Sequence, residues 1–172
     1  MRMSTVQFGA AVTLVCAALA LPSNAGAVDL RDWGRKYDNA SERFELLASF
    51  NNEAVLDKET QLVWRRSASS ATSWVFALQN CHASGAGGRY GWRLPSFSEL
   101  LSLVGTGTSS VLPAGHPFLN VTEQAYYWSS TDLYPNPAYA WTKPLLVHAI
   151  AAKSKDSAQA YLCVRGVGVA DR

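Results

Sequence analysis

Hydrophobic and polar positions follow a strand-like pattern in the first half of the chain. The runs 54–56 and 61–64 are mainly apolar and are joined by the polar segment 57–60, which predicts two strands connected by a turn. Residues 43–50 alternate more weakly and predict a further strand before them. This part of the chain therefore predicts the beginning of an antiparallel sheet.

The next segment changes to helical spacing. Four apolar residues recur at i, i+3, i+4 and i+7 and form one inward-facing stripe: Trp74, Ala77, Leu78 and Cys81. Thr72 or Ser73 is suited to cap this helix, and the glycine-rich segment 85–88 ends it.

A second, shorter helix is predicted after Pro95. Ser96 and Glu99 have the spacing of a capping box, in which the two side chains bond the N–H groups at the helix start. Apolar residues continue this helix to residue 104, and Gly105 ends it. We interpret Glu99 as structural, with a catalytic acid as the alternative.

The second half of the chain contains a long loop and several further strands. Residues 105–124 predict the loop. Four runs predict successive strands: 126–130, 139–143, 145–151 and 158–165. Polar or proline-containing segments separate them: 132–137, Pro144 and 153–157. This order predicts an α+β fold, with two short helices on a mainly antiparallel sheet and long loops.

Residues 1–27 have the pattern of a secretory signal peptide. Arg2 gives a positive start, residues 8–21 form an apolar run, and the small residues 25–27 provide a cleavage site. The run is too short for a comfortable membrane span, and an uncleaved anchor is the alternative. We therefore expect an exported protein, periplasmic or extracellular, with no membrane span after cleavage.

The composition limits the class of protein. The 172 residues are 48% hydrophobic and 16% charged, which suits one domain with a core and excludes a disordered chain. We divide the mature chain into a polar lead-in segment, 28–42, and a domain, 43–172. The 15 basic and 13 acidic side chains nearly balance, so we expect no nucleic-acid partner.

Two cysteines, Cys81 and Cys163, remain after removal of the signal peptide. In an oxidising compartment they predict one disulfide that closes a loop of about 80 residues. Two free, buried thiols are the alternative.

Several segments together resemble a known family. The matching segments are Val55–Asp57, Thr60–Trp64, Trp92–Ser96 with Glu99, Tyr126–Ser130, Ala140–Trp141 and Cys163–Gly166. They are similar, over roughly residues 43–166, to the bacterial secreted domain family named for the C-terminal domain of the Lcl adhesin. The pieces around Arg93 and Cys163 also resemble, more distantly, the formylglycine-generating enzymes. Both families imply a C-type-lectin-like fold, in which the first helix is bridged to the last strand and the first and last strands pair.

The chain departs from these families at their functional sites. Pro135 precedes Asn136-Pro137, and Ser129 follows Trp128, so the carboxylates of a calcium-dependent sugar site are missing. The reactive cysteine pair of the formylglycine-generating enzymes is also missing. The three histidines have no metal-ligand spacing. We therefore expect no metal, no cofactor and no catalytic residue.

The distribution of charge provides the candidate binding residues. From residue 60 onward, nine side chains are basic and five are acidic. Six of the cations could converge on one face and bind sulfate or carboxylate groups: Arg65, Arg66, Arg89, Lys143, Lys153 and Lys155. Arg93 could join them, but we interpret it as part of a structural salt bridge. Tyr134, in a proline-rich loop, is the candidate for an exposed stacking ring. Of the two interpretations we favour the other, a surface with scattered cations.

These observations favour a secreted, non-enzymatic binding or adhesion module. Its expected partner is an acidic or sulfated glycan, since the resemblance implies glycosaminoglycan binding. The alternative is an envelope scaffold, or a protein-interaction component, with no glycan ligand.

Overall fold

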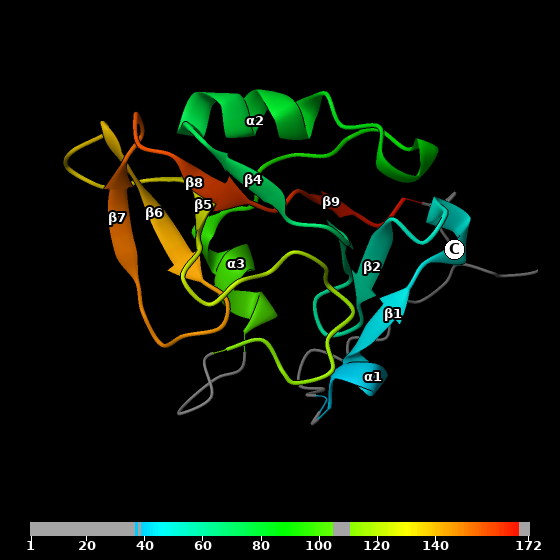
Figure 1. Ribbon diagram of the computed structural model, residues 1–172. Coiled ribbons are helices and arrows are strands. Elements are labelled where there is room, and N and C mark those ends of the chain that lie inside the picture. The colour runs from blue at the N-terminus through cyan, green and yellow to red at the C-terminus, as the bar shows by residue number, and fades with distance from the viewer. Residues whose placement is uncertain (1–36, 38, 105–110, 169–172) are drawn as a thin grey trace, which may run out of the picture. The chain divides into compact units, whose positions relative to one another are not determined.

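A computed structural model describes residues 37, 39–104 and 111–168 (Figure 1). The predicted signal peptide lies outside the described residues, as do most of the lead-in segment and part of the predicted loop, residues 105–110. Within the described part of the chain, no helix has the length and apolar character needed to cross a membrane.

Four strands form a first, antiparallel sheet in the order β1-β2-β3-β9. The strands are β1 (Phe44–Leu46), β2 (Ala54–Asp57), β3 (Leu62–Arg65) and β9 (Val164–Gly166). The predicted hairpin is confirmed, because β2 pairs with β3 across the polar turn. The family resemblance implies that the first and last strands pair. The last strand, β9, instead pairs with β3, and β1 lies at the opposite edge of the sheet.

Five strands form a second sheet in the order β4-β8-β5-β6-β7. The strands are β4 (Ser69–Thr72), β5 (Tyr126–Asp132), β6 (Tyr139–Pro144), β7 (Ala151–Ser154) and β8 (Gln159–Tyr161). All pairs are antiparallel except β5 with β8, which is parallel. The α+β class with mainly antiparallel sheets is therefore confirmed.

Three expectations about strands are wrong. Residues 145–150 form an irregular connection, and β7 begins only at Ala151. The predicted strand 158–165 is two strands that belong to different sheets, β8 and β9. The predicted strand 43–50 is β1 followed by a 3₁₀ turn, η2 (Ala48–Phe50).

Two helices of seven or more residues lie against the five-stranded sheet. Figure 1 shows α2 (Trp74–His82) along one side of its strands and α3 (Phe97–Leu103) on the other. The predicted capping box of α3 is confirmed, because Glu99 N donates to Ser96 Oγ at 3.2 Å and Ser96 N donates to Glu99 Oε2 at 2.8 Å. A one-turn helix, α1 (Ala40–Arg43), precedes β1, and a 3₁₀ turn, η3 (Ala86–Gly88), follows α2.

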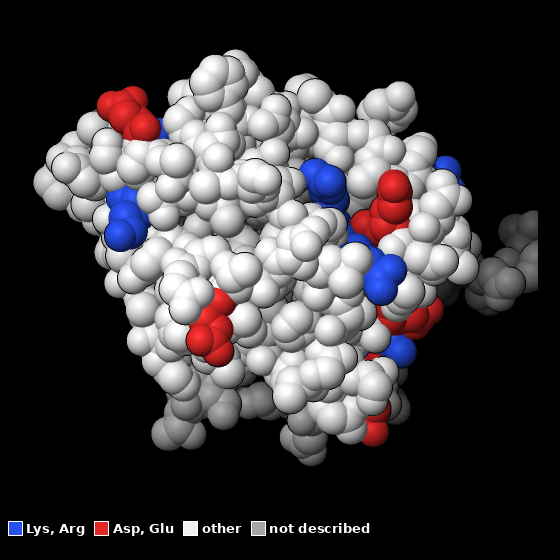
Figure 2. Space-filling model, viewed as in Figure 1, with Lys and Arg blue, Asp and Glu red and all other residues white. Residues whose placement is uncertain are grey.

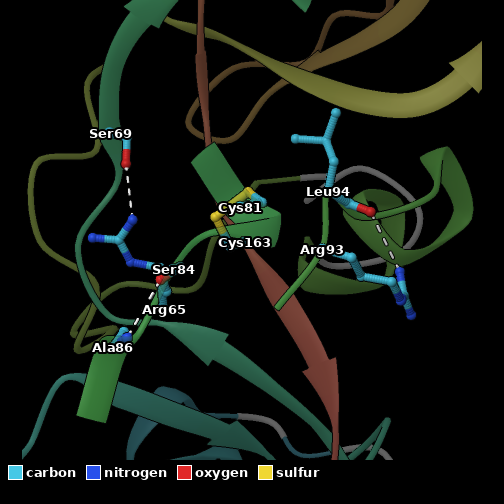
Figure 3. The surroundings of a disulfide bond; sticks show 8 residues. All are labelled: Arg65, Ser69, Cys81, Ser84, Ala86, Arg93, Leu94 and Cys163. Atoms are coloured by element: carbon cyan, nitrogen blue, oxygen red, sulfur yellow. Dashed lines mark hydrogen bonds between the residues drawn. A yellow bond between two sulfur atoms is a disulfide. The ribbon is translucent and has the colours of Figure 1, made fainter. Parts of the chain in front are cut away.

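The disulfide is present between Cys81, in the last turn of α2, and Cys163, which immediately precedes β9 (Figure 3). Both cysteines are fully buried, and their Cα atoms are 5.4 Å apart. Cys163 lies where the chain passes from β8 in one sheet to β9 in the other. The disulfide therefore fixes α2 to the crossing point between the two sheets.

Aromatic side chains fill much of the core, as their positions in predicted elements suggest. Trp64, Trp92 and Trp128 are each less than 2% exposed. Trp64 belongs to one buried cluster, and Trp92 and Trp128 belong to a second cluster that also contains both cysteines. Burial of large rings supplies a major share of the driving force for folding.

Candidate ligand-binding cleft

A polar cleft of about 790 Å³ lies where the first sheet meets the C-terminal end of α2. Its wall is formed by the turn before β2, the end of β3 and the turn that follows α2. The larger polar side chains in its lining are Asn51, Asn52, Glu53, Arg65, Arg66, Asn80 and Tyr161. We call this region the Arg65–Arg66 cleft. Its volume is typical of small-molecule sites, which hold about 300–1,000 Å³.

Backbone hydrogen bonds place the two arginines. Arg65 is the last residue of β3, and its N–H donates to the carbonyl oxygen of Cys163 at 2.9 Å. The backbone N–H of Arg66 donates to the carbonyl oxygen of Glu53 at 2.8 Å, which places Arg66 beside Glu53. The disulfide and the pairing of β3 with β9 thereby hold this wall of the cleft in place.

A left-handed turn brings Glu53 to the cleft. Asn51 and Asn52 have φ angles of 52° and 59°, a conformation that asparagine tolerates better than most residues. The chain reverses there, and the Glu53 side chain reaches η3, where its Oε2 accepts from Gly87 N at 2.5 Å. The Glu53 carboxylate is therefore held in one position on the cleft wall.

The two guanidinium groups are held by uncharged oxygen atoms. Arg65 Nη1 donates to Ser69 Oγ at 3.3 Å (Figure 3). Arg66 Nε donates to the carbonyl oxygen of Pro117 at 3.1 Å, and Arg66 Nη1 donates to that of Asn52 at 3.5 Å. Over residues 37, 39–104 and 111–168, the ion pairs join other side chains and involve neither arginine. Both positive charges thus face the cleft without a paired carboxylate from the described chain.

The other four predicted cations do not join this cleft. Arg89 is half-buried and lies over the Phe50 ring, with Cζ 5.7 Å from its centroid. Lys153 lies on β7, with its Nζ 4.3 Å from the centroid of Tyr126. Lys155 forms a 2.6 Å ion pair with Asp132. Figure 2 shows the basic side chains of the viewed face in separate small patches. The six cations therefore do not all lie on one face: Arg65 and Arg66 share the cleft, and the other four lie elsewhere, as the interpretation of scattered cations has it.

Lys143 is the clearest correction among the predicted binding residues. It is 1% exposed, and its ammonium donates to the carbonyl oxygens of Pro144 at 2.7 Å and Val147 at 2.9 Å. Burial lowers the pKa of this ammonium below its ordinary value. Lys143 therefore holds the irregular connection after β6 and is not placed to bind a ligand at the surface.

Tyr134 is 92% exposed at the tip of the loop between β5 and β6. This loop lies beside Lys155, whose N–H donates to the carbonyl oxygen of Ala138 at 2.9 Å. Tyr134 is not part of the lining of the Arg65–Arg66 cleft. The exposed ring and the arginine pair are thus separate features of the surface.

Sequence reasoning missed Glu53, Asn80 and Tyr161. The Asn51-Asn52 doublet directly after a predicted strand was the available sign of a turn that could return the chain toward β3. No comparable sign exists for Asn80 or Tyr161, which reach the cleft from α2 and β8.

Within the residues that the structure describes, no group of three or more His, Cys, Asp or Glu side chains gathers in a way that could hold a metal ion. His116 is half-buried away from the Arg65–Arg66 cleft, and burial lowers the pKa of its imidazole.

The fold is a disulfide-linked α+β domain with a polar cleft whose lining includes Arg65 and Arg66. The chain belongs to the Lcl C-terminal domain family, whose sequence model matches residues 53–165. The matched region begins at Glu53 on the cleft and ends at Arg165 in β9. The predicted family is therefore confirmed. No curated protein matches the chain.

Proposed function

We propose that this protein is an exported, non-enzymatic binding module that holds an acidic glycan in the Arg65–Arg66 cleft. The observation that carries the proposal is the position of Arg65 and Arg66, which lie together in one cleft with uncharged oxygen atoms as their partners. Guanidinium groups pair with carboxylate and sulfate in a two-pronged geometry, which makes them suitable for such ligands.

Two further features support export. Residues 1–27 have the pattern of a signal peptide. The disulfide between Cys81 and Cys163 is consistent with an oxidising compartment, since such bonds persist outside the cytosol. A C-type-lectin-like arrangement, which the family resemblance implies, is part of the same proposal.

Retention on immobilised acidic glycans at different salt concentrations tests the proposal. We expect the mature protein to bind at low ionic strength and to elute as salt is added, because salt screens exposed charges. Arg65→Gln is expected to lose most of the retention. Lys153→Gln removes the same charge from β7, on the far edge of the second sheet from β4, and is expected to retain wild-type behaviour. Absence of retention at low ionic strength, or equal retention of wild type and Arg65→Gln, would overturn the proposal.

A second candidate function is a scaffold that binds a protein partner and no glycan. Val75 and Phe76 on α2 are 51% and 58% exposed, and Tyr134 is 92% exposed. Large exposed apolar side chains are typical anchors of protein interfaces. A single stoichiometric protein partner in a pull-down, lost in Phe76→Ser, together with no glycan retention, would favour this candidate.

A further inference from the structure

We infer that the Arg65–Arg66 cleft recognises a single carboxylate on a hydroxyl-rich sugar ring, as in a uronic acid, in preference to a densely sulfated chain. This inference rests on the proposed function and specifies its ligand. Three observations support it: the hydrogen bonds that each guanidinium already makes, the bond that holds the Glu53 carboxylate, and the amide side chains that line the cleft.

Arg65 retains the edge of its guanidinium that grips a carboxylate. Its hydrogen bond to Ser69 uses Nη1, which leaves Nε and Nη2 pointing along one edge. Arg43 uses this same pair of atoms elsewhere in the protein, where Nε and Nη2 donate to the two carboxylate oxygens of Asp57 at 2.9 Å and 2.7 Å. Arg65 is therefore equipped to hold one planar carboxylate by two parallel hydrogen bonds.

Arg66 has less capacity for an anion. Its Nε and Nη1 atoms already donate to the carbonyl oxygens of Pro117 and Asn52. The bond from Nε breaks the Nε–Nη2 edge, so Arg66 adds positive charge but cannot hold a carboxylate in the way that Arg43 does. The cleft consequently provides for one strongly bound anionic group.

Glu53 makes the cleft unfavourable for many negative charges. Its carboxylate is fixed on the wall by the bond from Gly87 N to Oε2, and its carbonyl oxygen accepts from Arg66 N. A fixed carboxylate repels sulfate groups that come close to it, yet it accepts hydrogen bonds well from hydroxyl groups. The charge pattern therefore favours a ligand with one acid and several hydroxyl groups.

The remaining polar side chains suit hydroxyl groups in the same way. Asn51 and Asn80 line the cleft, and both are exposed. An amide both donates and accepts, as a hydroxyl group does, so each can pair with a sugar hydroxyl in either direction. A volume of about 790 Å³ leaves room for a sugar ring and a neighbouring residue.

Calorimetric titration of the full mature chain with three related probes tests this inference. The probes are an unsulfated disaccharide that contains glucuronic acid, the same disaccharide with the carboxyl group reduced to an alcohol, and its O-sulfated form. We expect the unsulfated acid to bind about tenfold or more tightly than the reduced form, because the reduced form loses the charge-assisted hydrogen bonds to Arg65. The sulfated form is expected to bind more weakly than the unsulfated acid.

Glu53→Gln provides the decisive variant. The glutamine retains a side-chain oxygen for Gly87 N but removes the negative charge. We expect this variant to bind the sulfated probe more tightly than wild type does, so that the preference for the unsulfated acid shrinks several-fold. The ratio of two affinities on one protein does not depend on the fraction of folded molecules, which separates this effect from a loss of stability.

The outcomes distinguish the inference from the proposed function. If wild type binds the sulfated probe more tightly than the unsulfated acid, or if Glu53→Gln leaves the ratio unchanged, the inference is overturned while Arg65-dependent glycan binding stands. If no probe binds and no acidic glycan retains the protein, both are overturned. A preference for the unsulfated acid that depends on both Arg65 and Glu53 supports both.

Discussion

The guanidinium of Arg43 grips the carboxylate of Asp57 inside the protein, with Nε–Oδ1 and Nη2–Oδ2 distances of 2.9 Å and 2.7 Å. Arg43 is 4% exposed and Asp57 is fully buried. Arg43 Nη2 also donates to the carbonyl oxygen of Ser102 in α3, and Arg43 Nε lies 3.2 Å from Glu59 Oε2. Arg43 thus joins the end of α1 to β2 through the ion pair with Asp57, and to α3 through the bond to Ser102.

Removal of one partner of the Arg43–Asp57 ion pair is expected to lower the free energy of unfolding. Asp57→Ala leaves the buried Arg43 guanidinium with Glu59, 3.2 Å away, as its remaining carboxylate. Loss of one partner of a buried pair typically lowers the free energy of unfolding by about 3–5 kcal/mol, and Glu59 is expected to keep the loss near the lower end of that range. Urea denaturation measures the change. The double variant Arg43→Met with Asp57→Leu removes both charges and is expected to lose less than Asp57→Ala. A loss below about 1 kcal/mol in Asp57→Ala would contradict this account.

Reduction of the disulfide is expected to remove a large share of the stability. Cys81 and Cys163 are 82 positions apart, and a loop of this length corresponds to about 4–5 kcal/mol in the chain-entropy description. Thermal unfolding with and without reductant measures the effect. A variant with alanine at both positions serves as the control, because added reductant should not change its midpoint. Equal midpoints for fully reduced and oxidised wild type would rule out this contribution.

Gly87 and Gly88 form a matched pair for substitution by alanine. Both have positive φ angles, 63° and 68°, so either substitution strains the backbone. A Cβ at Gly87 would lie 2.6 Å from Phe50 Cβ and 2.8 Å from Phe50 Cα, whereas one at Gly88 would meet nothing within 4 Å. We expect Gly88→Ala to cost about 1 kcal/mol and Gly87→Ala distinctly more, as measured by chemical denaturation. Equal losses of unfolding free energy in the two variants would contradict the prediction, because they would mean that Phe50 moves aside without penalty.

Glu99 is expected to give the stability a dependence on acid pH. The hydrogen bond from Arg93 holds the pKa of the Glu99 carboxyl below its ordinary value, aided by the bond from Ser96 N. A carboxyl group with a lowered pKa in the folded state stabilises that state above the pKa of the unfolded chain, and this stabilisation is lost as the pH falls through the folded pKa. Wild type should therefore exceed Glu99→Gln in stability near pH 7, and the difference should shrink as the pH falls toward about 3.

The control for this comparison is Glu123→Gln. Glu123 forms no ion pair within the described ranges, so its variant removes one negative charge without the bond to Arg93. Urea midpoints at both pH values provide the measurement. A difference between wild type and Glu99→Gln that is the same at both pH values would contradict the assignment.

Sequence patterns predicted the helices and turns that are stabilised by contacts between residues close together in the sequence. The capping box of α3 depends on residues three positions apart, so Ser96 and Glu99 could be identified from the sequence alone. β4 has the sequence Ser-Ser-Ala-Thr, with no large apolar residue, and it is a strand because it pairs with β8 some 90 residues later. Pairing of this kind is decided by the tertiary fold, which overrides local preference.

The apolar segment 145–150 was misassigned for a related reason. Its residues suit a strand, but Leu145 is fully buried and accepts from Leu112 N at 2.7 Å, while Val147 accepts from the Lys143 ammonium. These distant and side-chain bonds satisfy the backbone groups that a strand would have paired.

The candidate site was half predictable. Adjacent arginines at 65 and 66 are visible in the sequence, and both line the cleft. Glu53 is twelve positions before Arg65, and only the left-handed turn at Asn51 and Asn52 brings its carboxylate to the same wall. The burial of Lys143 depends on the packing of the second sheet and could not be read from its neighbours in sequence.

The disulfide between Cys81 and Cys163 also limits the effect of proteolytic cleavage. Every peptide bond from residue 82 to residue 162 lies within one covalent ring. A single cleavage anywhere in that ring, including the exposed loop around Tyr134, leaves both pieces attached to each other. The two fragments would separate only after a thiol reagent breaks the disulfide, so a nicked molecule would still carry both walls of its cleft.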